Sequence, residues 1–564
     1  MRVSLSRWLF VALLFVALPA GAMGIELDAP EDIAGLLAPH LPEEFAGAGA
    51  GQHRLQVLIG EIVATEGYFS PRIDFAEADD AVRITVDPGR RTQVVAVTVT
   101  IGGALDADRR NALIAAWPLP AGQPFRQDQW TAAKQEILGR LLGEDFANAR
   151  LVDSAADIDP LAAEARLNVH YDAGPRYRFG ELRVEGLHRF PESLVGRYNR
   201  SIEPGQEYSE DRINRLQATL QATPYFRSVL VSIDRSAPPG PDGVVEVPVV
   251  VRVTERPAHR LSFGAGFSSN TGARVAFGYQ SPDLFGQAWE LDSGLRLEQK
   301  QQTAYADVLL PPDEKQWRHS VGVMAQASDI EGLRSERVAV GAQRIRLREQ
   351  LETRLSVTWQ DERLYPDGAP GSRAQALVPN VAWSWRKVDN LLDPRDGLVL
   401  QAQVGGASAA VLSDRDFVRL LARYQQFIPL GDANILTLRG EAGATLADAR
   451  EGIPQDYVFR TGGTGSVRGY DYQSLGVKEG EATVGGRYLA TASIELTHWL
   501  NPEWGIAGFV DAGDAVDQLD DFDLAFGYGL GARWRSPAGP LAVDVAYGER
   551  DQRVRVHFAL AIAF

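Results

Sequence analysis

The last eleven residues alternate between apolar side chains and polar or small ones. The apolar set is Val554, Val556, Phe558, Leu560, Ile562 and Phe564, and the other set is Arg555, His557, Ala559, Ala561 and Ala563. Successive side chains of a β-strand point to opposite faces. In an outer-membrane barrel, one face meets lipid and the other meets a polar lumen. The pattern therefore predicts that the chain ends as the closing strand of a membrane β-barrel.

The same alternation runs through residues 257–564, where helical periodicity nearly vanishes. Sixteen strands are expected, starting near residues 260, 273, 288, 303, 320, 337, 352, 377, 398, 417, 435, 487, 505, 525, 541 and 554. Bacterial barrels have even strand numbers. A soluble sandwich also alternates, but it does not normally carry this many strands to the last residue.

The amino terminus has the features of a secretory signal peptide. Arg2 and Arg7 precede an apolar run at 8–18 and the small-residue site Ala20-Gly21-Ala22, so cleavage after Ala22 is expected. A membrane-spanning helix needs about 20 apolar residues, and no segment supplies them. Any membrane insertion must therefore use strands.

Composition removes several classes of function. The chain has no cysteine, which excludes a lipid-anchored amino terminus, disulfides and thiolate metal sites. Its net charge of -17 argues against nucleic acid as a partner, because phosphates require a basic footprint.

Residues 25–256 mix helix and strand patterns and contain a repeat. The segment 87–91 recurs in related form at 172–176, and 122–125 recurs at 205–208. Repeated segments indicate repeated modules. Each module is predicted to run strand, helix, helix, strand, strand. The alternative is that these modules are only compact spacers.

Two of the modules yield explicit element boundaries. For the third, the predicted elements are 178–184, 191–198, 210–221, 226–234 and 244–254. In the first, helices are expected at 30–37 and 54–66, strands at 68–75 and 81–87, and a loop at 45–51. Its opening strand is expected to be short or missing.

A connection of about 40 residues, from 446 to 485, is far longer than a usual hairpin loop. Gly462, Gly463 and Gly469 let its backbone turn tightly around one long cation, Arg468. An arginine in a polar lumen binds carboxylates in a bidentate way. Glu495 on the next strand and Asp511 on the strand after it are the expected partners.

Val467-Arg468-Gly469-Tyr470 resembles the signature lumenal-loop motif of the BamA/TamA superfamily. Residues 492–495 and 508–513 are similar to its acidic strand motifs, and 536–541 and 389–397 are similar to other family segments. The resemblance implies α+β repeats followed by an all-β part: three POTRA domains and a 16-stranded antiparallel transmembrane β-barrel. The implied division is a signal peptide at 1–22, POTRA domains at 23–90, 91–174 and 175–256, and the barrel at 257–564.

The resemblance also implies a function. BamA usually carries five such modules and two-partner secretion transporters usually carry two, so three modules point to the TamA family. The implied partners are a TamB-like inner-membrane protein, unfolded outer-membrane protein clients such as autotransporters, and outer-membrane lipids. The implied location is the outer membrane of a Gram-negative bacterium, with the POTRA domains in the periplasm.

In that superfamily the first and last strands meet at a seam that opens sideways and lets a client strand pair with the exposed edge. Gly264 and Gly266 fit poor pairing in the first strand, because glycine weakens strands. They could equally be ordinary residues near a turn. Phe558 and Phe564 are assigned to the other side of the seam. The sequence has no glycine after Gly548, so a glycine-based kink in the last strand is not supported.

Three alternatives remain open. An enzyme is disfavoured because the chain has no G-x-S-x-G motif and its eight histidines lack metal-ligand spacing. No catalytic residue, metal or cofactor is therefore expected. A passive porin is disfavoured by the three modules. Within the superfamily, a two-partner secretion transporter and a BamA-like insertase are the other candidates.

Overall fold

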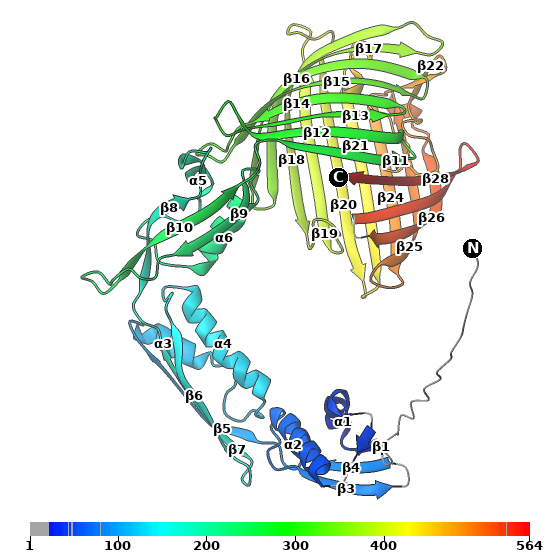
Figure 1. Ribbon diagram of the computed structural model, residues 1–564. Coiled ribbons are helices and arrows are strands. Elements are labelled where there is room, and N and C mark those ends of the chain that lie inside the picture. The colour runs from blue at the N-terminus through cyan, green and yellow to red at the C-terminus, as the bar shows by residue number, and fades with distance from the viewer. Residues whose placement is uncertain (1–21, 43, 47–48, 79–80, 537–538, 564) are drawn as a thin grey trace, which may run out of the picture. The chain divides into compact units, whose positions relative to one another are not determined.

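The computed structural model describes residues 22–42, 44–46, 49–78, 81–536 and 539–563 (Figure 1). The chain divides into two compact units, and the division runs through the module of residues 177–255. The expected signal peptide, residues 1–22, lies outside the described residues except for Ala22.

The first module contains a four-stranded sheet and two α-helices. Its elements are β1 (Ala22–Asp28), α1 (Glu31–Leu37), the 3-10 turn η1 (Ala38–His40), β2 (Glu44–Ala46), α2 (Ala50–Thr65), β3 (Arg72–Ala78) and β4 (Ala81–Asp87). The sheet order is β2-β1-β4-β3, and β1 runs parallel to β4.

Two expectations for this module were wrong. The opening strand is present, because Ile25 and Leu27 pair with the core strand β4, a long-range contact that local sequence does not reveal. The expected loop at 45–51 is interrupted by β2, which pairs with β1, and by the start of α2 at Ala50. Tertiary pairing here overrides the low strand propensity of small residues.

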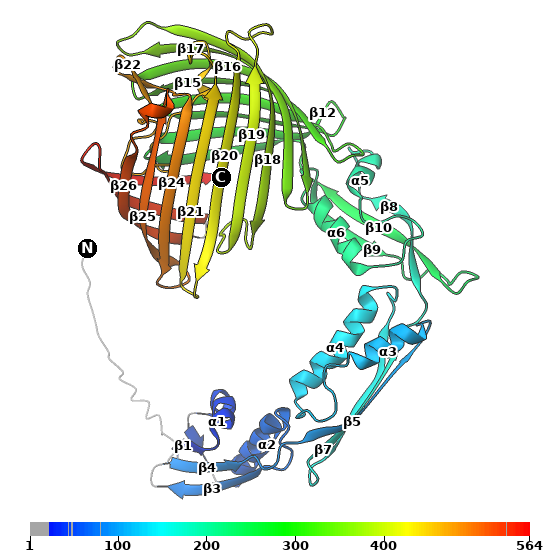
Figure 2. The same cartoon turned by 180° about the vertical axis from the view of Figure 1, so that it is seen from behind.

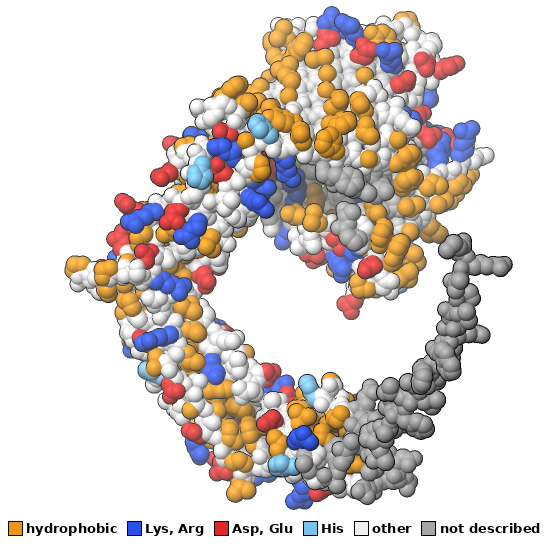
Figure 3. Space-filling model, in the orientation of Figure 1, with side chains coloured by type: hydrophobic (Ala, Val, Ile, Leu, Met, Phe, Trp, Pro, Cys, Tyr) orange, Lys and Arg blue, Asp and Glu red, His pale blue; other side chains and the backbone are white. Residues whose placement is uncertain are grey.

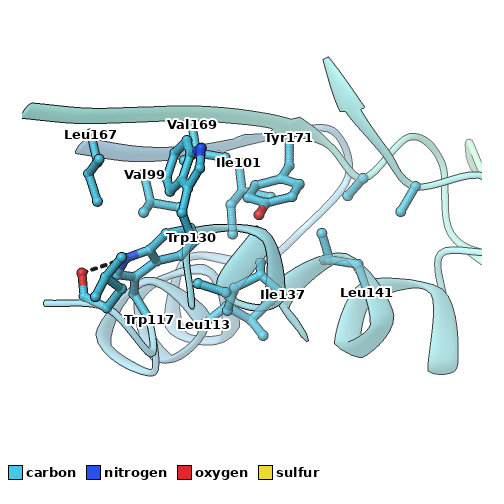
Figure 4. Packing of buried hydrophobic residues seen from close by; sticks show 14 of the residues in the cluster. Val99, Ile101, Leu113, Trp117, Trp130, Ile137, Leu141, Leu167, Val169 and Tyr171 are labelled. Atoms are coloured by element: carbon cyan, nitrogen blue, oxygen red, sulfur yellow. Dashed lines mark hydrogen bonds between the residues drawn. The ribbon is translucent and has the colours of Figure 1, made fainter. Parts of the chain in front are cut away.

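The second module packs two helices on a three-stranded sheet. Its elements are β5 (Gln93–Gly102), α3 (Ala107–Ala115), α4 (Gln127–Gly143), β6 (Arg150–Asp159) and β7 (Glu164–Asp172), with sheet order β5-β7-β6. Figure 4 shows Trp130, Ile137 and Leu141 of α4 directed at alternate residues of the sheet. The indole of Trp117 donates to the carbonyl of Leu119 at 2.9 Å, which satisfies its buried N–H.

The third module repeats this plan. Its elements are β8 (Tyr177–Glu185), α5 (Ser193–Tyr198), α6 (Glu210–Gln221), β9 (Phe226–Ile233) and β10 (Val245–Glu255), with sheet order β8-β10-β9. The predicted order of elements is confirmed. No helix among the described residues is long and apolar enough to cross a membrane.

Sixteen further strands form a closed barrel in which successive wall strands pair and the last strand pairs with the first (Figures 1 and 2). The first eight are β11 (Arg260–Ser268), β12 (Gly272–Leu284), β13 (Trp289–Glu298), β14 (Gln301–Leu309), β15 (Arg318–Ile330), β16 (Leu333–Arg348), β17 (Leu351–Pro366) and β18 (Ser372–Val388). The second eight are β19 (Gly397–Ala407), β20 (Phe417–Leu430), β21 (Asn434–Leu446), β24 (Tyr488–Trp499), β25 (Trp504–Val516), β26 (Ala525–Ser536), β27 (Gly539–Gly548) and β28 (Arg553–Ala563). The predicted sixteen-stranded barrel is confirmed.

The barrel wall is apolar outside and polar within. On β28, Val554 and Val556 are 64% and 53% exposed, whereas His557 is buried. Figure 3 shows apolar side chains spread over the outer surface of the barrel. This is the surface that a lipid bilayer would cover.

The long connection between β21 and β24 spans residues 447–487. It contains a 3-10 turn η2 (Gln455–Tyr457) and a small hairpin of β22 (Val477–Glu479) and β23 (Ala482–Val484), which the sequence did not predict. Its central segment meets the inward-facing side chains of the wall.

Candidate functional site: the lumenal loop and the barrel seam

Arg468 is clasped by three carboxylates inside the barrel. Its Nε and Nη2 donate to the two oxygens of Asp511 at 2.7 and 2.9 Å, the bidentate geometry expected of an arginine. Its Nη1 donates to Glu495 at 2.6 Å and to Asp544 at 3.1 Å. The structure thus brings together the arginine and both carboxylates that the sequence had suggested.

Sequence reasoning missed two members of this cluster, Asp544 on β27 and Arg533 on β26. Arg533 bridges the same two acids, Glu495 at 2.9 Å and Asp544 at 2.5 Å. Asp544 lies between the outward Val543 and Val545, so an isolated acid within an apolar alternation was the available signal.

The clasp, formed by Arg468 with Asp511, Glu495 and Asp544, is buried and consists of close ion pairs. Arg468 is 2% exposed and Asp511 is fully buried. The guanidinium carbon of Arg468 lies 3.3 Å from the centroid of the Phe509 ring, so an aromatic face covers the cation. Removing one member of a buried ion pair typically costs about 3–5 kcal/mol, because its partner is left uncompensated.

Glycines on both sides let the loop backbone lie directly on the wall. A Cβ at Gly469, where φ is +95°, would lie 2.8 Å from the backbone nitrogen of Gly548. A Cβ at Gly527 on β26 would lie 1.8 Å from the carbonyl oxygen of Arg468. Gly462 and Gly463 also have positive φ, +107° and +99°, which favours glycine.

The other residues of the motif anchor the loop by packing. Val467 and Tyr470 are fully buried. The Tyr470 hydroxyl donates to the carbonyl of Phe526 at 2.9 Å and accepts from the backbone nitrogen of Arg550 at 3.0 Å. All six residues assigned to the motif therefore lie in the segment that contacts the wall.

The loop is bonded to the last strand. The backbone nitrogen of Gly469 donates to Nε2 of His557 at 2.8 Å, and Arg555 donates to the carbonyl of Gly469 at 2.7 Å. Arg555 also pairs with Asp471 at 2.8 Å. These two inward residues of β28 tie the closing strand to the loop.

The loop is also bonded to the hairpin that joins the first two strands. The Thr464 hydroxyl donates to the side-chain oxygen of Asn270 at 2.9 Å. Asn270 follows β11, whereas Arg555 and His557 lie on β28. One loop therefore contacts both sides of the junction between the first and last strands.

That junction is the expected seam. Gly264 pairs with Ala563 and Gly266 pairs with Ala561, and five residue pairs join β11 to β28 among the described residues. Phe558 stacks on Phe267 with ring centroids 5.2 Å apart. Phe564, also assigned to the seam, lies outside the described residues.

Two family models match this chain. The model described as the Omp85 superfamily domain matches residues 257–564, more than half of the chain and the whole barrel. The chain belongs to the Omp85 superfamily. The POTRA model, described as a surface antigen variable number repeat, matches residues 177–256 and covers the module that precedes the Omp85 barrel.

Curated relatives in the superfamily are assembly factors. The outer membrane protein assembly factor BamA of Neisseria meningitidis is 24% identical over 90% of this chain and 72% of its own length. BamA of Nitratidesulfovibrio vulgaris is 27% identical over 179 residues. This match covers 30% of this chain and 22% of the length of that relative.

A solved Omp85 structure has the same fold. The crystal structure of BamA from Haemophilus ducreyi lacking POTRA domains 1–3 has a TM-score of 0.68 and 16% sequence identity. The match covers 84% of this chain and all of that one. At this identity the likeness establishes the fold alone.

Proposed function

We propose that this chain inserts or translocates outer-membrane proteins, with its barrel in the outer membrane of a Gram-negative bacterium and its modules in the periplasm. The observation that carries the proposal is the seam. Its first and last strands pair at five positions among the described residues, and the lumenal loop contacts both of its sides. The proposed work is non-enzymatic and needs no cofactor.

The physical basis of the proposal is strand addition. When β11 and β28 separate, each leaves a row of backbone N–H and C=O groups without partners. An extended client segment satisfies those groups by pairing as an additional strand, whatever its side chains are. The unfolded client gains backbone hydrogen bonds inside the membrane, where water supplies none.

The Arg468 clasp sets which barrel state is favoured. The loop contacts β28 through Arg555 and His557 and reaches the β11 side through Asn270. A docked loop therefore favours the closed seam. Clients shift the population toward an open seam only by binding that state more tightly.

A reversible disulfide tests this proposal, because the chain has no cysteine of its own. We expect that Gly266→Cys with Ala561→Cys, at paired positions of β11 and β28, blocks client assembly when oxidised. Reduction should restore assembly. The measurement is insertion of a radiolabelled barrel client into proteoliposomes.

The matched control is Ala342→Cys with Val357→Cys, which are paired positions of β16 and β17. This pair also cross-links two neighbouring strands, but at a distance from the seam in strand order. It should leave assembly unchanged. Undiminished assembly through an oxidised seam would overturn the proposed mechanism.

The finer assignment that we propose is a TamA-type role, in which a TamB-like inner-membrane protein docks on the modules and the clients include autotransporters. Three α+β modules precede the barrel, and β3 lies at an edge of the first sheet. A photo-crosslinker at Asp74 on β3 should capture an elongated inner-membrane protein. The same probe at Arg83 on the central strand β4 should capture much less.

BamA-like insertion and two-partner secretion are the rival functions within the superfamily. Capture of barrel precursors without any inner-membrane protein would favour a BamA-like insertase, and capture of one exported substrate would favour two-partner secretion. A passive porin predicts a large steady conductance. The loop lies inside the barrel and lines separate hollows of about 370 Å³ beside Phe459 and about 260 Å³ beside Arg439, so we expect small or flickering conductance.

A further inference from the structure

The outward face of β16 changes character along its length. Val338 and Val340 are 50% and 43% exposed, as expected for a lipid-facing wall. The same face then continues with Arg344, Arg346 and Arg348. Along the outward face of β16, three cations therefore follow an apolar band in the direction of the strand's carboxyl end.

This end of β16 is the end at which the modules join the barrel. The barrel strands alternate in direction, so β16 finishes at the same rim at which β11 begins after the last module. In the proposed orientation that rim faces the periplasm. The three arginines therefore lie at the level of the headgroups of the periplasm-facing leaflet.

Trp317 fixes two of these cations. The guanidinium carbons of Arg344 and Arg346 lie 4.8 and 4.6 Å from the centroid of its ring. Tryptophan prefers the membrane–water interface, where an apolar ring body and a polar N–H are both satisfied. The ring holds both guanidinium groups at that depth and leaves their N–H donors free for a ligand.

The three arginines are not neutralised by the protein. Within the described part of the chain, no carboxylate lies within 4.0 Å of Arg344, Arg346 or Arg348. Asp313, on the turn before β15, accepts from the backbone nitrogen of Trp317 at 2.9 Å and lies 3.1 Å from His319. Its carboxylate is therefore already engaged.

The neighbouring strands complete an interfacial surface. On β17, Arg346 pairs with Thr353 and Arg348 with Leu351, and these two residues in turn pair with Trp383 and Trp385 on β18. Both tryptophans are 40% exposed. The cations are thus flanked by interfacial tryptophans on either side.

We propose that Arg344, Arg346 and Arg348 form a site for the phosphate of an anionic phospholipid in the periplasm-facing leaflet. Guanidinium groups match phosphate oxygens in a bidentate way, and the adjacent apolar wall suits the acyl chains. Arg344 and Trp317 also line an open hollow with polar residues such as Lys315 and Asn199. The occupant that we propose is a lipid rather than free phosphate, because the strand face that carries the three cations continues into the exposed apolar wall at Val338 and Val340.

The test is native mass spectrometry of the full-length protein in detergent, titrated with phosphatidylglycerol or with phosphatidylcholine. One cation near an anionic lipid surface contributes an attraction that corresponds to about a fivefold change in affinity. Arg344→Gln with Arg346→Gln should therefore weaken phosphatidylglycerol binding about 25-fold. Binding of phosphatidylcholine should change little.

The chain offers a matched control at the opposite end of the same face of β16. Arg334 also lies over an aromatic ring, 5.7 Å from the centroid of Tyr365, but it is paired with Glu336 at 2.6 Å. Arg334→Gln should leave the affinity unchanged. Arg344→Lys with Arg346→Lys preserves both charges but loses the bidentate fit and the stacking on Trp317, so it should bind phosphatidylglycerol more weakly than the parent protein and more tightly than the double glutamine variant.

Three results would overturn the proposal: equal loss in the Arg334 variant, unchanged affinity in the double glutamine variant, or displacement of the lipid by inorganic phosphate at low concentration. The last result would identify the site as one for free phosphate. Heat-modifiable migration in gels reports whether each barrel is folded. If the double variant does not fold, the single Arg346→Gln variant carries the test, with about a fivefold loss expected.

Discussion

Two strand pairs in this barrel are joined in different ways. β16 and β17 are consecutive in sequence and pair without interruption from Leu333 with Pro366 to Arg348 with Leu351. β11 and β28 lie at opposite ends of the barrel sequence and share five pairs among the described residues. Backbone pairing therefore holds the first pair along its whole length, whereas the second pair has a shorter backbone ladder and relies on further contacts as well.

Those further contacts come from the lumenal loop. Asn270 on one side and Arg555 and His557 on the other bond to the loop, and Arg468 fixes the loop to β24, β25 and β27. A short backbone ladder supplemented by side-chain contacts is easier to weaken than a long ladder of backbone bonds. We therefore expect the wall to open at the seam before it opens between β16 and β17.

The largest expected effect comes from Arg468→Ala, which leaves Glu495 and Asp544 paired with Arg533 and leaves Asp511 without an ion-pair partner among the described residues. We expect a loss of about 3–5 kcal/mol in loop docking, because the remaining charges are buried. Client assembly should weaken while the barrel still folds. Urea unfolding measures the loss of stability, heat-modifiable migration shows whether the barrel is folded, and proteoliposome insertion measures client assembly.

The control for that substitution is Arg423→Ala. Arg423 also points into the lumen and pairs with Glu441 at 2.8 Å, but its side chain is 55% exposed. Exposed pairs contribute about 0–1 kcal/mol, so this variant should behave like the parent protein. Client assembly at the parent rate in the Arg468 variant would contradict the clasp.

A smaller effect is expected from Gly527→Ala. The added Cβ would meet the carbonyl oxygen of Arg468, and overpacking of this kind costs about 1–3 kcal/mol. Gly465→Ala, in the lumenal loop itself, has no atom within 4 Å of the new methyl group. Thermal denaturation should separate the two, and equal melting temperatures would show that close backbone contact with the wall is unnecessary.

The smallest effect is expected from Asn270→Ala, which removes the acceptor of a 2.9 Å hydrogen bond from the Thr464 hydroxyl and of a longer 3.4 Å one from the Thr464 backbone nitrogen. Their loss should cost about 1 kcal/mol. Amide hydrogen exchange should accelerate in β11 and β28 and stay unchanged in β16 and β17. Asn380→Ala on β18 is the control, because its amide makes only a 3.4 Å contact with Ser356. Equal acceleration of amide hydrogen exchange in all barrel strands would contradict the proposed difference between the two strand pairs.

The barrel could be predicted from sequence because lipid on one side and water on the other impose a two-residue period on every strand. The long interruption of that period, from 446 to 485, and the glycines within it identified Arg468 as the anchor of the connection. Glu495 and Asp511 were within reach of prediction because they lie on the two strands that follow the loop.

Predicting the missed residues would have required the register between strands, which the two-residue period of each strand does not give. Asp544 and His557 reach the loop from strands late in the barrel, and only the stagger of β27 and β28 brings them level with Gly469. Asn270 belongs to a hairpin almost two hundred residues before Thr464. The opening strand of the first module was missed for a related reason, since its partner β4 is separated from it by two helices.

The position of the clasp along the chain affects how this protein itself is made. Arg468 bonds to Ser493, Glu495, Asp511 and Asp544, and all four follow it in sequence. During synthesis from the amino terminus, the cation has none of its three carboxylates until Glu495 on β24 has been made. A copy that ends before Glu495 therefore carries an uncompensated arginine and an unanchored loop, and this distinguishes it chemically from a complete copy.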